Sequence, residues 1–226
     1  MELQTQIDEL KAKVAQLEAL LDGGNPRFGT ITCKEWQVVD KDGKVRISVA
    51  TFADGNAAMQ WNDKDGKKRI AAGTTADGGA GVLWLDKDEK VRIVVQTDPD
   101  GNANVIWFDK DEKLRITAGT FASGEASVQW RDKDGKMRIG AQTRPDGSAG
   151  VQWKDKDEKQ RITAATFADG SAGVDWKDKD EKQRIAAATF ADGTAGVQWK
   201  DKDEKLRIGA AVMPDGTVRL PMRDLK

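Results

Sequence analysis

The chain has no histidine and no tyrosine, and it has one cysteine among its 226 residues. Without histidine, no Ser/His/Asp catalytic arrangement can form. The single cysteine, Cys33, cannot form a disulfide within the chain, and we expect it to act as a small apolar residue. The chain also lacks a phosphate-cradling loop. We therefore expect no catalytic, cofactor or metal site, and we do not expect an enzyme.

The chain also lacks a large excess of either charge and lacks long apolar runs. The net charge is −1, from 37 basic and 38 acidic residues, whereas nucleic-acid binding needs a basic surface. No apolar run approaches the ~20 residues that span a bilayer, and the N-terminus lacks the basic and apolar regions of a secretory signal. We expect no nucleic-acid partner and no membrane insertion. The localisation stays open between assembly in the cytoplasm and association with a virion or another particle.

What the chain does have is a repeat of 23 residues, which marks a repeat architecture. An Arg-Ile pair and a tryptophan both recur with this period. The tryptophans are Trp61, Trp84, Trp107, Trp130, Trp153, Trp176 and Trp199. A chain that repeats one unit eight times has little room for a unique catalytic centre.

Each repeat has the pattern of two strands. In one copy, alternate residues on either side of an Asp-Lys-Asp turn share one face, namely Ala149, Val151 and Trp153, then Ile162, Ala164 and Thr166. Period-two alternation is typical of a strand with one buried face. With two hairpin turns per repeat, about sixteen strands form an antiparallel meander, because parallel crossovers need about a dozen connecting residues. We expect an all-β shaft over residues 30–226.

The two turns in each repeat have hairpin chemistry. One reads Asp-Lys-Asp-Gly-Lys, as in Asp63–Lys67, and the other resembles Arg144–Gly147. Both suit a type I turn followed by a glycine in the left-handed conformation. Five copies of the first turn carry glutamate in place of that glycine, and we expect those turns to be looser. They contain Glu89, Glu112, Glu158, Glu181 and Glu204.

Residues 1–22 form a heptad segment, with Leu3, Leu10 and Leu17 at d and Ile7, Val14 and Leu21 at a. This pattern predicts a coiled-coil oligomerisation helix, and the alternative is an amphipathic helix docked on the sheet. A Gly/Pro linker follows over residues 23–29.

The apolar face of a single sheet needs a cover. We expect further copies of the chain to supply it, with the repeat tryptophans as oligomerisation residues. Three sheets enclosing a β-prism make a homotrimer, and two make a sandwich dimer. A four-bladed β-propeller is a further alternative, although neither turn type alternates between repeats as blades require.

Two consecutive repeats break the polar pattern of the outer face. Five apolar residues lie there on three successive strands, namely Leu83, Leu85, Val94, Ile106 and Phe108. The sequence predicts either drift or a docking patch for a protein partner or a neighbouring shaft.

Other periodic features have simpler explanations. The Asp-Lys-Asp-Gly turn resembles the start of a calcium loop, but it lacks the distal bidentate glutamate, so turn chemistry is favoured. The tryptophan row could bind sugars or choline, and the threonine row could bind ice. Both rows lie on the predicted inner face, which favours the core.

Three families share features with this chain. The glycine 17 residues after each tryptophan, as in Gly170 after Trp153, is similar to the MORN repeat. The Trp-Lys-Asp and Asp-Gly format resembles the YD repeats of toxin shells. A heptad helix before a β-repeat shaft resembles trimeric fibres of phages and bacterial surfaces. That last resemblance implies a structural fibre, shaft or scaffold that self-assembles as a homotrimer. The alternative function is a repeat-based recognition module, lectin-like or partner-binding.

Overall fold

The computed structural model describes residues 2–21 and 33–220. The chain divides into two units, Met1–Glu35 and Trp36–Lys226. The first unit contains helix α1 (Glu2–Leu21), close to the bounds expected for the heptad segment. The expected linker at residues 23–29 lies outside the described residues, as do residues 30–32 at the start of the expected shaft and the chain end from Pro221.

The sheet contains strands of two alternating lengths, six and seven residues, and the first and last strands are shorter. The strands are β1 (Glu35–Val39), β2 (Val45–Thr51), β3 (Ala57–Asn62), β4 (Lys68–Thr74), β5 (Ala80–Leu85), β6 (Val91–Thr97), β7 (Ala103–Phe108), β8 (Leu114–Thr120), β9 (Ala126–Arg131), β10 (Met137–Thr143), β11 (Ala149–Lys154), β12 (Gln160–Thr166), β13 (Ala172–Lys177), β14 (Gln183–Thr189), β15 (Ala195–Lys200), β16 (Leu206–Val212) and β17 (Val218–Arg219).

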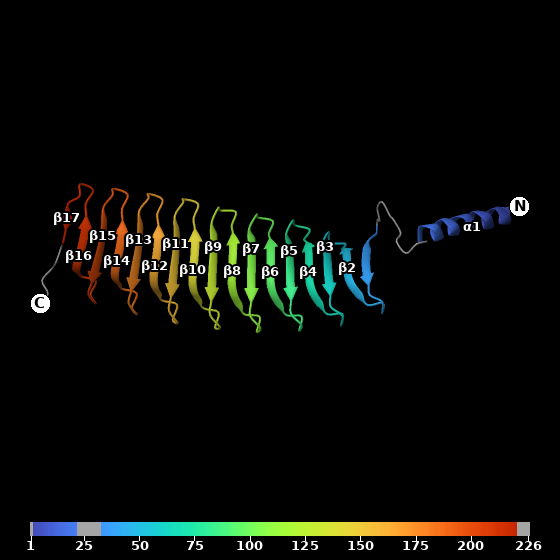
Figure 1. Ribbon diagram of the computed structural model, residues 1–226, viewed down its shortest axis with the longest axis horizontal. Coiled ribbons are helices and arrows are strands. Elements are labelled where there is room, and N and C mark those ends of the chain that lie inside the picture. Colours follow the sequence, from blue (N-terminus) through green and yellow to red (C-terminus); the bar gives the residue numbers. More distant parts are fainter. Residues whose placement is uncertain (1, 22–32, 221–226) are drawn as a thin grey trace. The chain divides into compact units, whose positions relative to one another are not determined.

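Each strand pairs with the next along the chain, so the 17 strands form one meander sheet (Figure 1). The pairs from β2 to β17 are all antiparallel. The predicted all-β meander is therefore confirmed. The propeller alternative is wrong, because all strands belong to one continuous sheet that is not divided into blades.

Both turn types close with the same two backbone hydrogen bonds. In the first type, the Gly66 N–H donates to the carbonyl of Asp63 at 3.0 Å and the Asp63 N–H donates to that of Lys67 at 2.9 Å. The five glutamates take the place of this glycine with φ between 58° and 62°. Their turns keep the same bonds, as in the 3.0 Å contact from Glu158 N to Asp155 O. The expectation that glutamate loosens the turn is wrong.

A β-bulge lies beside the Asp-Lys-Asp turns. Trp153 pairs with Ile162, but Lys154 pairs with Gln160, so the register skips Arg161. Equivalent shifts occur in the other hairpins that close with this turn from β3 to β16. The bulge lets the arginine reach back toward its turn. It also moves the residue before the arginine to the face of the sheet opposite to the one that simple alternation predicts.

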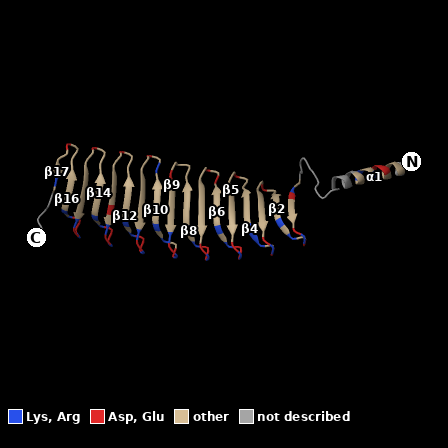
Figure 2. Ribbon diagram, viewed as in Figure 1, with Lys and Arg blue, Asp and Glu red and all other residues tan. Residues whose placement is uncertain are grey.

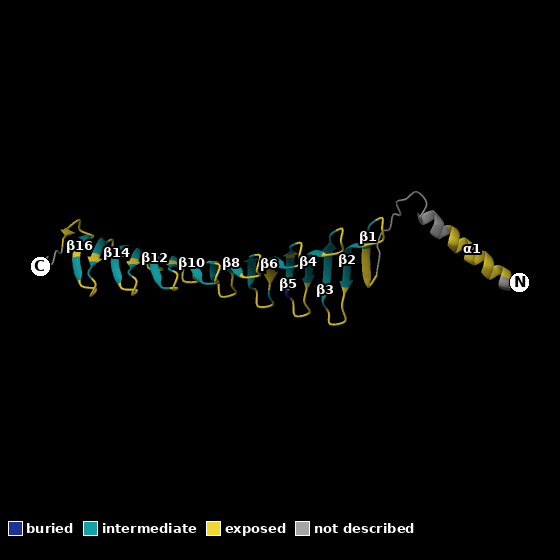
Figure 3. Ribbon diagram, turned by 90° about the horizontal axis from the view of Figure 1, so that it is seen from below, coloured by how far each residue is buried: buried dark blue, intermediate teal, exposed yellow. Residues whose placement is uncertain are grey.

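The sheet is a single layer in the described part of the second unit (Figure 3). Among the described residues, Ala186 is the only buried apolar side chain, and no large side chain is fully buried. Five of the repeat tryptophans keep 36–40% of their surface exposed. The predicted core around the tryptophans is thus not formed within one chain.

Candidate interaction surfaces

One face of the sheet carries no charge from β2 to β16. We call it the tryptophan face. Its residues in one repeat are those that pair in register, Trp153 with Ile162, Val151 with Ala164 and Ala149 with Thr166. At the equivalent positions of the other strands, only Trp, Ile, Val, Met, Ala and Thr occur. An uncharged face of this length is unusual for a surface in water, where large apolar patches mark interaction sites.

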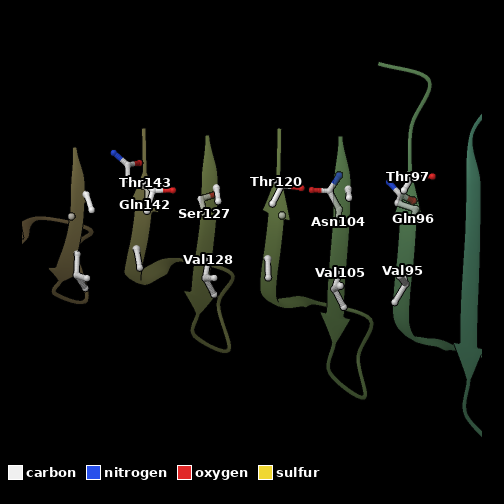
Figure 4. Close-up of a pocket in the computed structure, with 18 residues that line it drawn as sticks. Val95, Gln96, Thr97, Asn104, Val105, Thr120, Ser127, Val128, Gln142 and Thr143 are labelled. Atoms are coloured by element: carbon white, nitrogen blue, oxygen red, sulfur yellow. The ribbon is translucent and has the colours of Figure 1, made fainter. Parts of the chain in front are cut away.

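Side-chain size falls across the tryptophan face. The Trp–Ile pairs lie at the end of the strands near the Asp-Lys-Asp turns, and the Ala–Thr pairs lie at the other end. Two shallow hollows follow the small residues. One has a volume of about 710 Å³ and extends from β6 to β11 (Figure 4), and the other has about 590 Å³ and extends from β11 to β15. Neither is lined by tryptophan or isoleucine. The face therefore has a ridge along one side and a trough along the other.

The opposite face is mostly polar, and the five apolar residues of the predicted patch are brought together on it. Leu83 pairs with Val94, and Val94 pairs with Ile106. The register adds two residues that the sequence did not reveal, since Val91 pairs with Leu85 and Leu114 pairs with Phe108. Simple alternation assigns Val91 to the tryptophan face, and only the bulge at Arg92 moves it. All seven side chains are half-buried.

The sheet edge formed by the Asp-Lys-Asp turns is held together by ion pairs. The arginine after each turn pairs with the first aspartate of the same turn, as Arg92 does with Asp86. Arg92 also donates to the carbonyl of Lys110 in the next turn at 3.2 Å. Partial desolvation raises the pKa of Asp86, but hydrogen bonds from Arg92 and from the backbone N–H groups of Lys90 and Asp88 outweigh it and hold that pKa at about 2.

Lysines connect successive turns along the same edge. The Lys44 ammonium donates to the carbonyl of Lys64 at 3.3 Å, and Lys159 donates to Lys179 at 2.8 Å. The same bond recurs for Lys67, Lys90, Lys113, Lys136 and Lys182. Each turn is therefore tied to the next one by side chains as well as by the sheet.

The two turn edges differ in charge: one carries cations and anions together, and the other carries mostly anions (Figure 2). We call basic edge the segments 39–46, 62–69, 85–92, 108–115, 131–138, 154–161, 177–184 and 200–207, which sum to +8. We call acidic edge the segments 52–56, 75–79, 98–102, 121–125, 144–148, 167–171, 190–194 and 213–217, which sum to −8. Arg144 is the only cation of the acidic edge. The near-zero net charge of the chain therefore hides a strong separation of charge across the sheet.

Aspartates of the acidic edge also stabilise their own turns. Asp169 Oδ1 accepts the backbone N–H of Ser171 at 2.9 Å and the Ser171 hydroxyl at 2.6 Å. These bonds, the side-chain one first, lower the pKa of Asp169. The Asp169 carboxylate is therefore ionised at neutral pH.

Helix α1 exposes part of its predicted heptad seam. Ile7, Leu10 and Val14 keep 38%, 63% and 47% of their surface exposed, and they line a shallow groove. The side chains of Leu3, Leu17 and Leu21 lie outside the described part of the chain. The described part of the apolar seam is thus open in one chain, and the coiled coil stays a prediction.

Among the residues with described positions, no group of three or more His, Cys, Asp or Glu side chains is arranged to hold a metal ion. In the same part of the chain, no helix combines the length and apolar character that crossing a membrane requires.

No protein-family model matches the chain, and no curated protein matches it. Among solved structures, it is similar to the TCP domain of SAS-4 (dCPAP) from Drosophila melanogaster, which was solved in complex with a proline-rich motif of Ana2 (dSTIL). The two chains are 14% identical, the match covers 90% of this chain and 99% of the other, and the TM-score is 0.32. A similarity at this TM-score carries no argument about function.

Proposed function

We propose that the protein is a structural shaft or scaffold that assembles as a homotrimer, in which copies of the chain cover one another's tryptophan faces. One observation carries this proposal: a face without charges is open to water along the sheet, and five of its seven tryptophans keep 36–40% of their surface exposed. Burying apolar surface contributes about 25 cal/mol per Å². Covering a face of this extent is therefore expected to stabilise an assembly strongly.

Another copy of the chain is the cover that fits best. The face is periodic from β2 to β16, so a partner that covers it needs a surface of the same length and period. A second copy has both. The open heptad seam of α1 supports the same conclusion, because heptad helices bring copies of a chain together. Three sheets around one axis enclose the tryptophan rows in a prism.

The solution mass tests this proposal. Light scattering is expected to give three times the chain mass of 24.7 kDa. The double variant Val128→Asp, Val151→Asp places charge on the tryptophan face and is expected to give monomers. The matched control Gln129→Asp, Gln152→Asp places the same charges one residue further along, on the opposite face, and is expected to stay trimeric. A monomeric wild type, or equal dissociation by both variants, overturns the proposal.

A second function, recognition of a protein partner, is favoured by the apolar residues of the opposite face. Leu83, Val94 and Ile106 lie in register on adjacent strands, and Leu85 and Phe108 lie nearby with Val91 and Leu114. In later repeats, the positions of Leu85 and Phe108 hold Arg131, Lys154, Lys177 and Lys200. This function is compatible with a shaft, because the patch faces away from the tryptophan face.

A further inference from the structure

We infer that the chains of the assembly lie parallel about an axis that follows the strand order, with the basic edge of one chain beside the acidic edge of the next. This inference rests on the proposed self-assembly and adds its direction. The occupant of each tryptophan face is then a second copy in the same orientation along the axis.

The first argument is charge. In a parallel arrangement around such an axis, each +8 edge lies next to a −8 edge. If the chains ran antiparallel, with a two-fold axis along the strands, basic edges would lie together and acidic edges would lie together. Single exposed ion pairs contribute little, about 0–1 kcal/mol each. Opposite rows of charge nevertheless favour one orientation, because an antiparallel arrangement brings like charges together at most repeats; only the segments 85–92, 108–115 and 144–148 are neutral.

The second argument is side-chain size, and it is independent of charge. The Trp–Ile ridge lies beside the basic edge, and the trough of small residues lies beside the acidic edge. Parallel chains place the ridge of one copy against the trough of the next. Antiparallel chains place ridge against ridge and trough against trough, which leaves the hollows of about 710 and 590 Å³ unfilled. Interiors of proteins are close-packed, and unfilled volume costs stability.

Cysteine cross-linking tests the direction. In a Cys33→Ala background, one variant carries Lys156→Cys on the basic edge, where the lysine side chain is 84% exposed. A second carries Ala168→Cys on the acidic edge, and a third carries both changes. A bismaleimide with a reach of about 10 Å is added. It cannot join the two edges of one chain, since a seven-residue strand is about 24 Å long.

Each single variant is expected to stay uncross-linked, a co-refolded mixture of the two is expected to give covalent dimers, and the double variant is expected to give covalent trimers. Covalent dimers from either single variant overturn the inference, as does an intact oligomer whose double variant does not cross-link. Light scattering on the same samples separates the two proposals. A monomer refutes self-assembly. An oligomer with same-edge cross-links keeps self-assembly but refutes the parallel arrangement, and with it the trimer around one axis.

Discussion

At the scale of single residues, the five turn glutamates show how this repeat tolerates local strain. Glu89, Glu112, Glu158, Glu181 and Glu204 all adopt positive φ, which costs a non-glycine residue about 1 kcal/mol or more. Two of these glutamates form a hydrogen bond that offsets part of this cost. The Glu89 carboxylate accepts the Lys68 N–H at 3.0 Å, and that of Glu181 accepts the Gln160 N–H at 3.1 Å. A side chain in one turn thereby stabilises the backbone of the preceding repeat.

This difference predicts opposite outcomes for the same substitution. Glu158→Gly is expected to raise the free energy of unfolding by about 1 kcal/mol, because glycine removes the strain and, among the described residues, Glu158 makes no such bond to the preceding repeat. Glu181→Gly is expected to gain less, because it also loses the bond to Gln160. Urea denaturation of both variants checks this. Equal gains would show that the glutamate bond contributes nothing.

The outer apolar residues give a second residue-scale prediction. Changing Leu85 and Phe108 together to lysine is expected to leave folding and the mass of the assembly unchanged, because Lys154 occupies the equivalent position in a later repeat. Binding of a protein partner, or lateral association of shafts, is expected to be lost. Circular dichroism and light scattering check the first part, and sedimentation at high concentration checks the second. A collapsed fold would show that these side chains belong to a core.

At the scale of the element, some arginines tie their own turn to the next one, as Arg69, Arg92 and Arg138 do. Arg138 is 24% exposed, and its guanidinium donates to the Asp132 carboxylate of its own turn and to the Asp155 carbonyl of the next turn. Lys133, in the same turn, is 82% exposed and pairs only with its neighbour Asp134 among the described residues. Removal of the Arg138 side chain therefore takes a donor from acceptors in two turns, whereas removal of the Lys133 side chain affects only Asp134.

Arg138→Met is expected to lower the free energy of unfolding by about 1–3 kcal/mol, because it leaves half-buried acceptors without a donor. Lys133→Met is expected to change it by less than about 0.5 kcal/mol, since exposed ion pairs contribute little. Urea denaturation of the two variants under identical conditions checks the difference. Similar losses in both would mean that the arginine ladder does not couple the hairpins.

At the scale of the whole molecule, the sheet repeats one set of contacts, so its stability is spread over nearest-neighbour repeats. The same is true of its response to pH. The first aspartate of every Asp-Lys-Asp turn has a lowered pKa, and that of Asp86 is held at about 2, against an ordinary value of 3.8. These groups bind fewer protons in the folded chain than in the unfolded chain at acid pH.

Stability is therefore expected to be fully present above about pH 4 and to fall as the pH drops through the lowered pKa values of these carboxylates, which for Asp86 is about 2. Thermal unfolding followed between pH 7 and pH 2 checks this. The variant Asp86→Asn is expected to be less stable at pH 7 and to lose less on acidification than the wild type. A wild-type stability that is constant from pH 4.5 to pH 2 would contradict this account.

The sequence alone determined the local structure. Period-two alternation around Val151 and Ala164 predicted the strands, the Asp-Gly turns predicted short hairpins, and the lack of long connections predicted an antiparallel meander. These features are local, because they depend on residues that are close in the chain.

Only the tertiary structure decided the features that depend on register between strands. The bulge at Arg92 moved Val91 to the outer face, and the hydrogen bonds of the turns made positive φ acceptable at Glu158. The meander separated two sets of turns that alternate in the sequence, so that +8 lies along one edge and −8 along the other. Charges that cancel along the chain add up along an edge, because strand pairing brings every second turn to the same side of the sheet.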